Sequence, residues 1–170
     1  MSTTAVGPQP TLGLEEYPKL WIDSACEVLG QIAGQPFQAK ALAAGEVQAP
    51  KSPVYALFTL GPPLAGEQVI GVSKADALKL ALLLMGDPSA KGATFDAENR
   101  EAFAELCRQI GGTAALSLGA RLQKEVETKL AGTDRPAWLG PATDSAYFHL
   151  SSSAIPAPML LSIQLSGSSR

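Results

Sequence analysis

The chain has 170 residues, of which 46% are hydrophobic and 17% are charged, and this balance is typical of a globular protein. The length suits one domain with a substantial core rather than two domains. Because 16 acidic residues exceed 13 basic ones and no basic cluster is present, the sequence argues against nucleic-acid binding through phosphate contacts.

The predicted order of elements is a helix, strands and a second helix, followed by a long helix and further strands. Pro18 suits the first turn of a helix that ends at Gly34. Ser73 opens another helix, with Asp76 three residues later as an approximate capping box. In chain order we expect a helix over 18–34, strands over 37–47, 54–60 and 68–72, helices over 73–86 and 96–122, and strands over 147–151 and 159–165. This order predicts an α+β fold with a largely antiparallel sheet.

The domain limits follow from composition. Residues 1–13 are small, polar and contain proline and glycine, so we expect them to be disordered, and we expect a frayed tail over 167–170. Between them, 14–166 is predicted to be one domain with halves over about 14–93 and 94–166. The run 78–85 is nearly apolar all round, which predicts a deeply buried helix, and it is too short to span a bilayer.

Few residues have the chemistry of a catalytic or metal site. Cys26 and Cys107 lie in apolar helical patterns without metal-ligand spacing, and His149, the only histidine, lies in an alternating strand. The first residues lack the pattern of a secretory signal. We therefore expect a reduced, cytoplasmic protein with no metal or cofactor of its own, in which Trp21 and Trp138 pack in the core or against a partner.

Two short segments of the chain are similar to each other. Residues 27–34 read Glu-Val-Leu-Gly-Gln-Ile-Ala-Gly and residues 105–112 read Glu-Leu-Cys-Arg-Gln-Ile-Gly-Gly, which are 78 positions apart. At 100° per residue, each predicted helix gathers a set of residues on one side, namely Asp23, Glu27, Gly30 and Gly34, and Glu101, Glu105, Arg108 and Gly112. We interpret the pair as an internal duplication with two acidic faces. A solvated helix face with glycines that allow close packing is the alternative.

These residues resemble the signature of the CheC/CheX chemotaxis-phosphatase family, in which a Glu precedes an Asn by three positions. Asp23, Glu27 and Pro53 fall on places of that signature, but Gly30 stands where the family has Asn. In the second half, Arg108 stands at the Asn place, behind Glu101 and Glu105, and Ala131 stands at the proline place. The neighbouring Gln31 and Gln109 resemble a segment of FliY-type flagellar switch domains.

The resemblance implies a duplicated fold with two long helices on a continuous sheet. It also implies binding of a CheY-like response regulator or of a flagellar switch protein, with Mg²⁺ supplied only through a bound regulator. In active members the Glu pairs with a regulator lysine, and the Asn amide orients the attacking water. Gly30 has no side chain, and Arg108 offers only donors, so the resemblance implies little or no phosphatase activity.

Several alternatives remain open from the sequence. Gln31 or Gln109 could supply the missing amide of an active phosphatase after a local rotation of the helix. Arg108 could instead contact phosphoryl oxygens and give binding without turnover. A third possibility is a structural module whose helices mediate self-association, for example as a homodimer.

Overall fold

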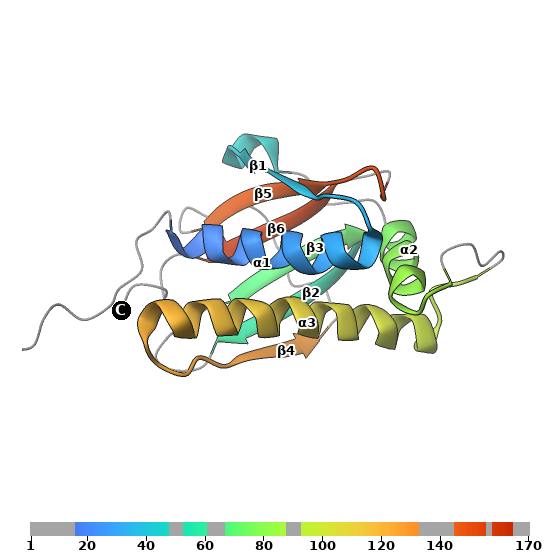
Figure 1. The fold of residues 1–170 in the computed structure, drawn as a ribbon. Coiled ribbons are helices and arrows are strands. Elements are labelled where there is room, and N and C mark those ends of the chain that lie inside the picture. Colours follow the sequence, from blue (N-terminus) through green and yellow to red (C-terminus); the bar gives the residue numbers. More distant parts are fainter. Residues whose placement is uncertain are drawn as a thin grey trace, which may run out of the picture.

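The computed structural model describes residues 16–47, 53–60, 67–87, 93–132, 145–155 and 158–164. Within these residues the chain forms three α-helices, a short 3-10 turn and one six-stranded sheet (Figure 1). The helices are α1 (Glu16–Ala33), α2 (Lys74–Leu84) and α3 (Ala97–Leu122). The strands are β1 (Gln38–Leu42), β2 (Pro53–Leu60), β3 (Glu67–Ser73), β4 (Thr128–Gly132), β5 (Ser145–Ser151) and β6 (Met159–Gln164). The predicted disordered segments 1–13 and 167–170 lie outside the described residues.

The sheet has the order β1-β5-β6-β3-β2-β4, and every neighbouring pair is antiparallel. Figure 1 shows the three helices on one face of this sheet. Helices α1 and α3 run side by side in opposite directions, and α2 lies at the end where α1 stops and α3 begins. The prediction of an α+β fold with an antiparallel sheet is therefore confirmed.

Two of the helices begin at side-chain caps, and the sequence predicts the one at Ser73. The Ser73 hydroxyl accepts a hydrogen bond from the backbone N–H of Asp76 at 3.1 Å, at the start of α2. The Asp96 carboxylate accepts one from the backbone N–H of Asn99 at 3.0 Å, at the start of α3. Each cap satisfies an N–H group that has no partner within its helix, which contributes about 1 kcal/mol.

The main core lies between the helices and the sheet. The ring of Trp21 from α1 packs on Phe58 from β2 with 5.4 Å between ring centroids, and Ile110 from α3 is buried in the same cluster. The prediction that Trp21 packs in the core is confirmed, whereas Trp138 lies outside the described residues. Cys26 and Cys107 are both free thiols.

Helix α2 is less buried than the sequence predicts. Leu80 and Ala81 are fully buried, but Leu83 and Leu84 are only half-buried, and Met85 is 41% exposed. Because α2 lies at the end of the helical layer (Figure 1), one side of it has no neighbouring helix. The prediction of a deeply buried helix is correct for one face only.

Two strand predictions need correction. The predicted strand over 37–47 stops at Leu42, because the chain then forms a 3-10 turn in which the Glu46 carboxylate accepts a hydrogen bond from Ala43 N–H at 2.8 Å. Strand β4 was not predicted at all. It forms an edge of the sheet and pairs with β2, with an irregularity in the register between Leu57 and Phe58.

The sheet order has an internal symmetry. Exchanging β1 with β4, β2 with β5 and β3 with β6 gives the same order read from the other end. The halves 14–93 and 94–166 thus contribute equivalent strands, each preceded by a long helix. The shared origin of the halves by duplication stays a prediction.

The register of the predicted repeat is wrong. Helix α1 is followed by Gly34 at φ 69°, and α3 is followed by Gln123 at φ 58°, so equivalent helix ends lie 89 positions apart rather than 78. Gly30 and Gly119 agree with this offset, because a Cβ on either would meet the carbonyl oxygen five residues later, at 3.5 and 2.9 Å. In this alignment Glu27 corresponds to Leu116, not to Glu105.

Candidate functional site

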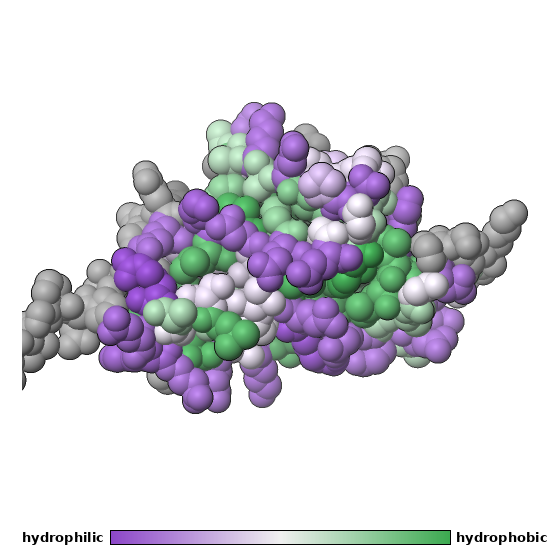
Figure 2. Space-filling view, in the orientation of Figure 1, coloured by the Kyte–Doolittle hydropathy of each residue, from purple (hydrophilic) through white to green (hydrophobic). Residues whose placement is uncertain are grey.

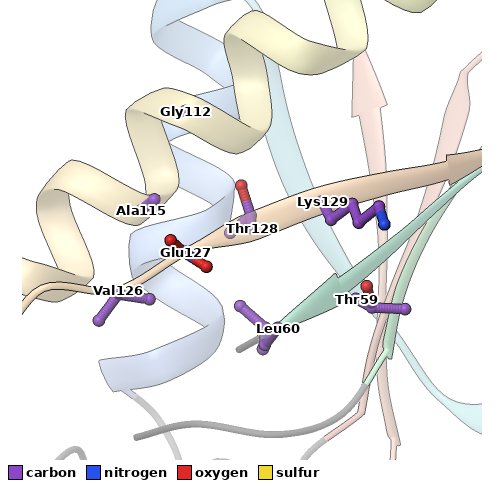
Figure 3. Close-up of a pocket in the computed structure, with 8 residues that line it drawn as sticks. All are labelled: Thr59, Leu60, Gly112, Ala115, Val126, Glu127, Thr128 and Lys129. Carbon is purple, nitrogen blue, oxygen red and sulfur yellow. The ribbon is translucent and has the colours of Figure 1, made fainter. Parts of the chain in front are cut away.

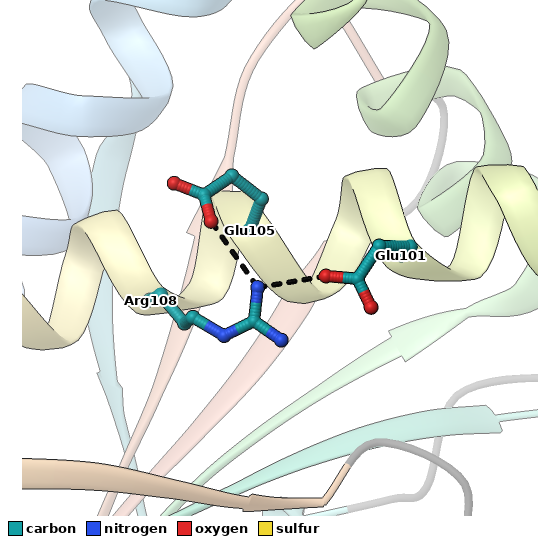
Figure 4. Close-up of polar contacts among 3 residues, drawn as sticks. All are labelled: Glu101, Glu105 and Arg108. Atoms are coloured by element: carbon teal, nitrogen blue, oxygen red, sulfur yellow. Dashed lines mark hydrogen bonds and ion pairs between the residues drawn. The ribbon is translucent and has the colours of Figure 1, made fainter.

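The predicted acidic residues of α3 form a cluster with Arg108. The Nη1 atom of Arg108 donates to Glu101 at 2.8 Å and to Glu105 at 3.1 Å (Figure 4). Glu105 lies one turn before Arg108 and Glu101 lies two turns before it, so all three side chains emerge from one side of the helix. The sequence correctly predicts that these residues lie together.

The cluster is exposed to solvent, with 47% of the Arg108 side chain accessible, 67% of Glu101 and 51% of Glu105. The hydrogen bonds to Glu101 and Glu105 raise the pKa of Arg108 above its ordinary value, so the guanidinium stays cationic. Exposed ion pairs of this kind are weak and exchange readily with other partners. The cluster therefore carries one net negative charge in a form that a binding partner can rearrange.

The predicted residues of α1 lie on a separate exposed face. Asp23 pairs with Lys19 of its own helix at 2.9 Å, and Glu27 and Gln31 are exposed in the following turns. Gly30 is half-buried, and Pro53 is the exposed first residue of β2.

Helices α1 and α3 themselves lie next to each other. The carboxylate of Glu16 and the guanidinium of Arg121 form an ion pair that joins the start of α1 to the end of α3. Because the helices are antiparallel and Glu16 pairs with Arg121, equal rises along the two helices bring Glu27 to about the level of residue 110 of α3. Figure 2 shows hydrophilic side chains over α1 and over the N-terminal half of α3.

A groove runs between α3 and the edge strand β4. It contains two adjoining cavities of about 570 and 340 Å³, which share Gly112, Thr128 and Lys129. The larger is lined by Thr59, Leu60, Gly112, Ala115, Val126, Glu127, Thr128 and Lys129 (Figure 3). Arg108 lines the smaller one, so the charged cluster borders this α3–β4 groove.

Leu116 is a surface residue that the sequence reading missed. Its side chain is 78% exposed, one turn beyond Gly112 on the outer side of α3. A helical wheel would have found it, because Leu116 falls 40° from Gly112 and away from the buried Ala114 and Leu118. The C-terminal half of α3 is thus less polar on its surface than the N-terminal half (Figure 2).

The described residues offer little other chemistry. No group of three or more His, Cys, Asp or Glu side chains among them could hold a metal ion. None of the described helices is both long and apolar enough to cross a membrane. His149 lies in strand β5, as predicted, and is half-buried there, and Gln109 is exposed on α3. The cluster around Arg108 is therefore the best candidate site.

The sequence matches no protein-family model, and no curated protein is recognisably similar to it in sequence. Solved structures are similar in three dimensions. CheX from Vibrio vulnificus has a TM-score of 0.67 at 14% identity, covering 88% of this chain and 98% of that one. A chain in the CheX-CheY-BeF3-Mg²⁺ complex from Borrelia burgdorferi has a TM-score of 0.64 at 16% identity, with 87% and 96% covered. FliY from Thermotoga maritima has a TM-score of 0.61 at 18% identity, with 88% and 86% covered.

This chain has the CheC/CheX fold. The resemblance inferred from the sequence is confirmed at the level of the fold, and the matches extend over most of the chain. That Arg108 on α3 stands at the place of the signature Asn stays a prediction from the sequence resemblance. The same holds for Asp23, Glu27 and Gly30 on α1, although matching the two helix ends pairs Glu27 with Leu116 rather than with Glu105.

Proposed function

We propose that this protein belongs to the CheC/CheX group and binds a CheY-like response regulator through the exposed face of α3, with little or no phosphatase activity. The observation that carries the proposal is the exposed cluster of Glu101, Glu105 and Arg108, which the sequence resemblance places at the family signature. The CheX-CheY-BeF3-Mg²⁺ complex from Borrelia burgdorferi contains a chain with the same fold. A flagellar switch protein is the other partner class, since a chain in the FliG-FliM complex of H. pylori is also similar, with a TM-score of 0.58.

The expected lack of turnover follows from the chemistry of Arg108. Hydrolysis of an aspartyl phosphate needs a group that positions water, and an amide can both donate to it and accept from it. A guanidinium only donates and stays protonated, and Nη1 of Arg108 is already bonded to two carboxylates. The protein would therefore hold the phosphorylated regulator without accelerating its hydrolysis.

The test measures binding and dephosphorylation of a CheY-like regulator from the same organism. We expect the wild-type protein to bind the regulator and to leave its rate of dephosphorylation unchanged. Arg108→Asn restores the signature amide and should accelerate dephosphorylation, and adding Glu105→Ala to it should abolish that gain. Fast dephosphorylation by the wild-type protein would contradict the proposed lack of activity.

An active phosphatase is the second candidate, because Gln31 and Gln109 are both exposed on their helices. Gln109 lies one turn beyond Glu105, so an amide is available near the cluster. If the wild-type protein is active, Gln31→Ala and Gln109→Ala identify which amide is used. Light scattering of the protein alone tests the remaining alternative, a module that only self-associates.

A further inference from the structure

The contacts of Arg108 leave part of its guanidinium available. Both hydrogen bonds to Glu101 and Glu105 leave from Nη1. Figure 4 shows the other two nitrogens of the guanidinium on the side away from Glu105. Because a guanidinium carries five N–H donors, one nitrogen neutralises the carboxylates while further donors remain for another anion.

The α3–β4 groove places a hydroxyl group beside that guanidinium. Arg108 lines the smaller cavity together with Thr128, whereas the Lys129 side chain lies on the other side of β4 (Figure 3). An anion at this end of the groove would meet the guanidinium of Arg108 and the hydroxyl of Thr128. The two glutamates lie along α3 toward its N-terminus, so acidic and basic groups occupy adjacent parts of one surface.

When no partner is bound, Arg108 forms its ion pairs with Glu101 and Glu105 of the same helix. A cation on a partner can pair with Glu101 or Glu105 only by competing with Arg108. Once displaced, Arg108 can pair with an anion beside that cation, where charge-assisted hydrogen bonds to a phosphoryl group are stronger than its exposed pairs. Binding of a surface with cation and anion side by side is thus an exchange of ion pairs.

We infer that Arg108 is a built-in selector for the phosphorylated form of the partner. Arg108 competes with cations of an unmodified regulator for the carboxylates of Glu101 and Glu105. When a phosphoryl group attracts the guanidinium, Arg108 leaves these carboxylates free to bind the regulator. The inference rests on the proposed function, because it takes a response regulator as the partner. It differs from catalysis, since Arg108 here sets which form of the regulator is bound.

The experiment measures the affinity of the regulator with and without beryllofluoride and Mg²⁺, for the wild-type protein and for Arg108→Ala. In Arg108→Ala the carboxylates of Glu101 and Glu105 no longer pair with Arg108 and can bind the regulator. The affinity of this variant for the unmodified regulator should therefore rise about two- to fivefold, as expected for weak exposed pairs. The affinity for the beryllofluoride form should fall about tenfold, because a charge-assisted contact is lost. The two affinities therefore move in opposite directions.

Two further variants separate this reading from general charge effects. Arg121→Ala also removes a guanidinium of α3 that is paired with a carboxylate, Glu16, and should leave both affinities unchanged. Arg108→Lys keeps the cation and should retain most of the preference for the beryllofluoride form. Folding of each variant is checked by circular dichroism and by its unfolding midpoint.

The outcomes are distinct. If both affinities of Arg108→Ala fall, rise or stay unchanged together, Arg108 is not a selector, although regulator binding itself stands. If the wild-type protein binds neither form of the regulator, the proposed function fails and the selector fails with it. Only opposite shifts, absent in Arg121→Ala, support the inference.

Discussion

Two adjacent glycines of α3 should respond in opposite ways to alanine. A Cβ on Gly111 would lie 3.0 Å from the hydroxyl of Thr128 and 3.1 Å from the nearest ring carbon of Phe58. A Cβ on Gly112 would have nothing within 4 Å. The first glycine faces the sheet and the second faces solvent, so the same substitution tests packing at one position and helix propensity alone at the other.

The magnitudes follow from two opposing effects. Replacing Gly by Ala inside a helix stabilises it by about 1 kcal/mol, and Gly112→Ala should keep most of this gain. For Gly111→Ala, crowding of a packed core costs about 1–3 kcal/mol. The ring of Phe58 is 1% exposed and packs against Trp21, so it cannot easily shift. We expect Gly111→Ala to be less stable than Gly112→Ala by about 1–3 kcal/mol.

Urea denaturation followed by circular dichroism measures this difference as a free energy of unfolding. In thermal unfolding it corresponds to a midpoint several degrees lower for Gly111→Ala, at about 2–4 °C per kcal/mol for a chain of this size. A Gly111→Ala protein as stable as Gly112→Ala would refute the close contact between α3 and the sheet.

Three further predictions concern buried polar groups, a cap and the thiols. Burial raises the pKa of Tyr17, whose neutral hydroxyl accepts a 2.9 Å hydrogen bond from Gln68, so Tyr17→Phe should lower the free energy of unfolding by about 1–3 kcal/mol in urea titrations. Ser73→Ala removes the cap of α2 and should cost about 1 kcal/mol by the same assay, with Ser73→Thr as the conservative control. Burial raises the pKa of both thiols, most strongly for Cys107, so iodoacetamide at pH 8 should modify Cys26 first and Cys107 only on unfolding. Equal labelling of the two thiols in the native protein, followed by mass spectrometry, would contradict the burial of Cys107.

Local signals made much of the fold predictable. Ser73 and Asp96 cap their own helices, so the signal and the structure lie within a few residues of each other. The alternating residues over 147–151 and 159–165 likewise located β5 and β6, although β6 is buried on both faces from Met159 to Ile163. Strand β4 was missed although Val126, Thr128 and Leu130 alternate with the exposed Glu127 and Lys129, because this pattern is short and the pairing with β2 depends on residues far away in the sequence.

The register error has a physical cause as well. Gly34 ends α1 in a left-handed conformation, and Pro36 follows it, whereas α3 continues through Gly111 and Gly112 for more than two further turns. Two glycines inside a helix cost about 2 kcal/mol, and packing of Gly111 on the sheet offsets part of that cost. Sequence identity between the two segments does not contain this information.

The candidate site was predictable in its residues but not in its bonding. Helical spacing alone brings Glu105 and Arg108 together. The reach of Arg108 to Glu101, seven residues earlier, requires the side chain to extend along the helix axis, and this depends on its rotamer. The exposure of Leu116 was available from the helical wheel and was overlooked.

The order of the strands ties the two halves of the chain to each other. Among the described residues, strand β1 of the first half pairs with β5 of the second alone, and β4 of the second pairs with β2 of the first alone. The edge strand of each half therefore pairs with a strand of the other half, as in a domain-swapped dimer. A fragment ending near residue 93 would leave β1 without its neighbour, so the sheet assembles only after most of the polypeptide has been synthesised.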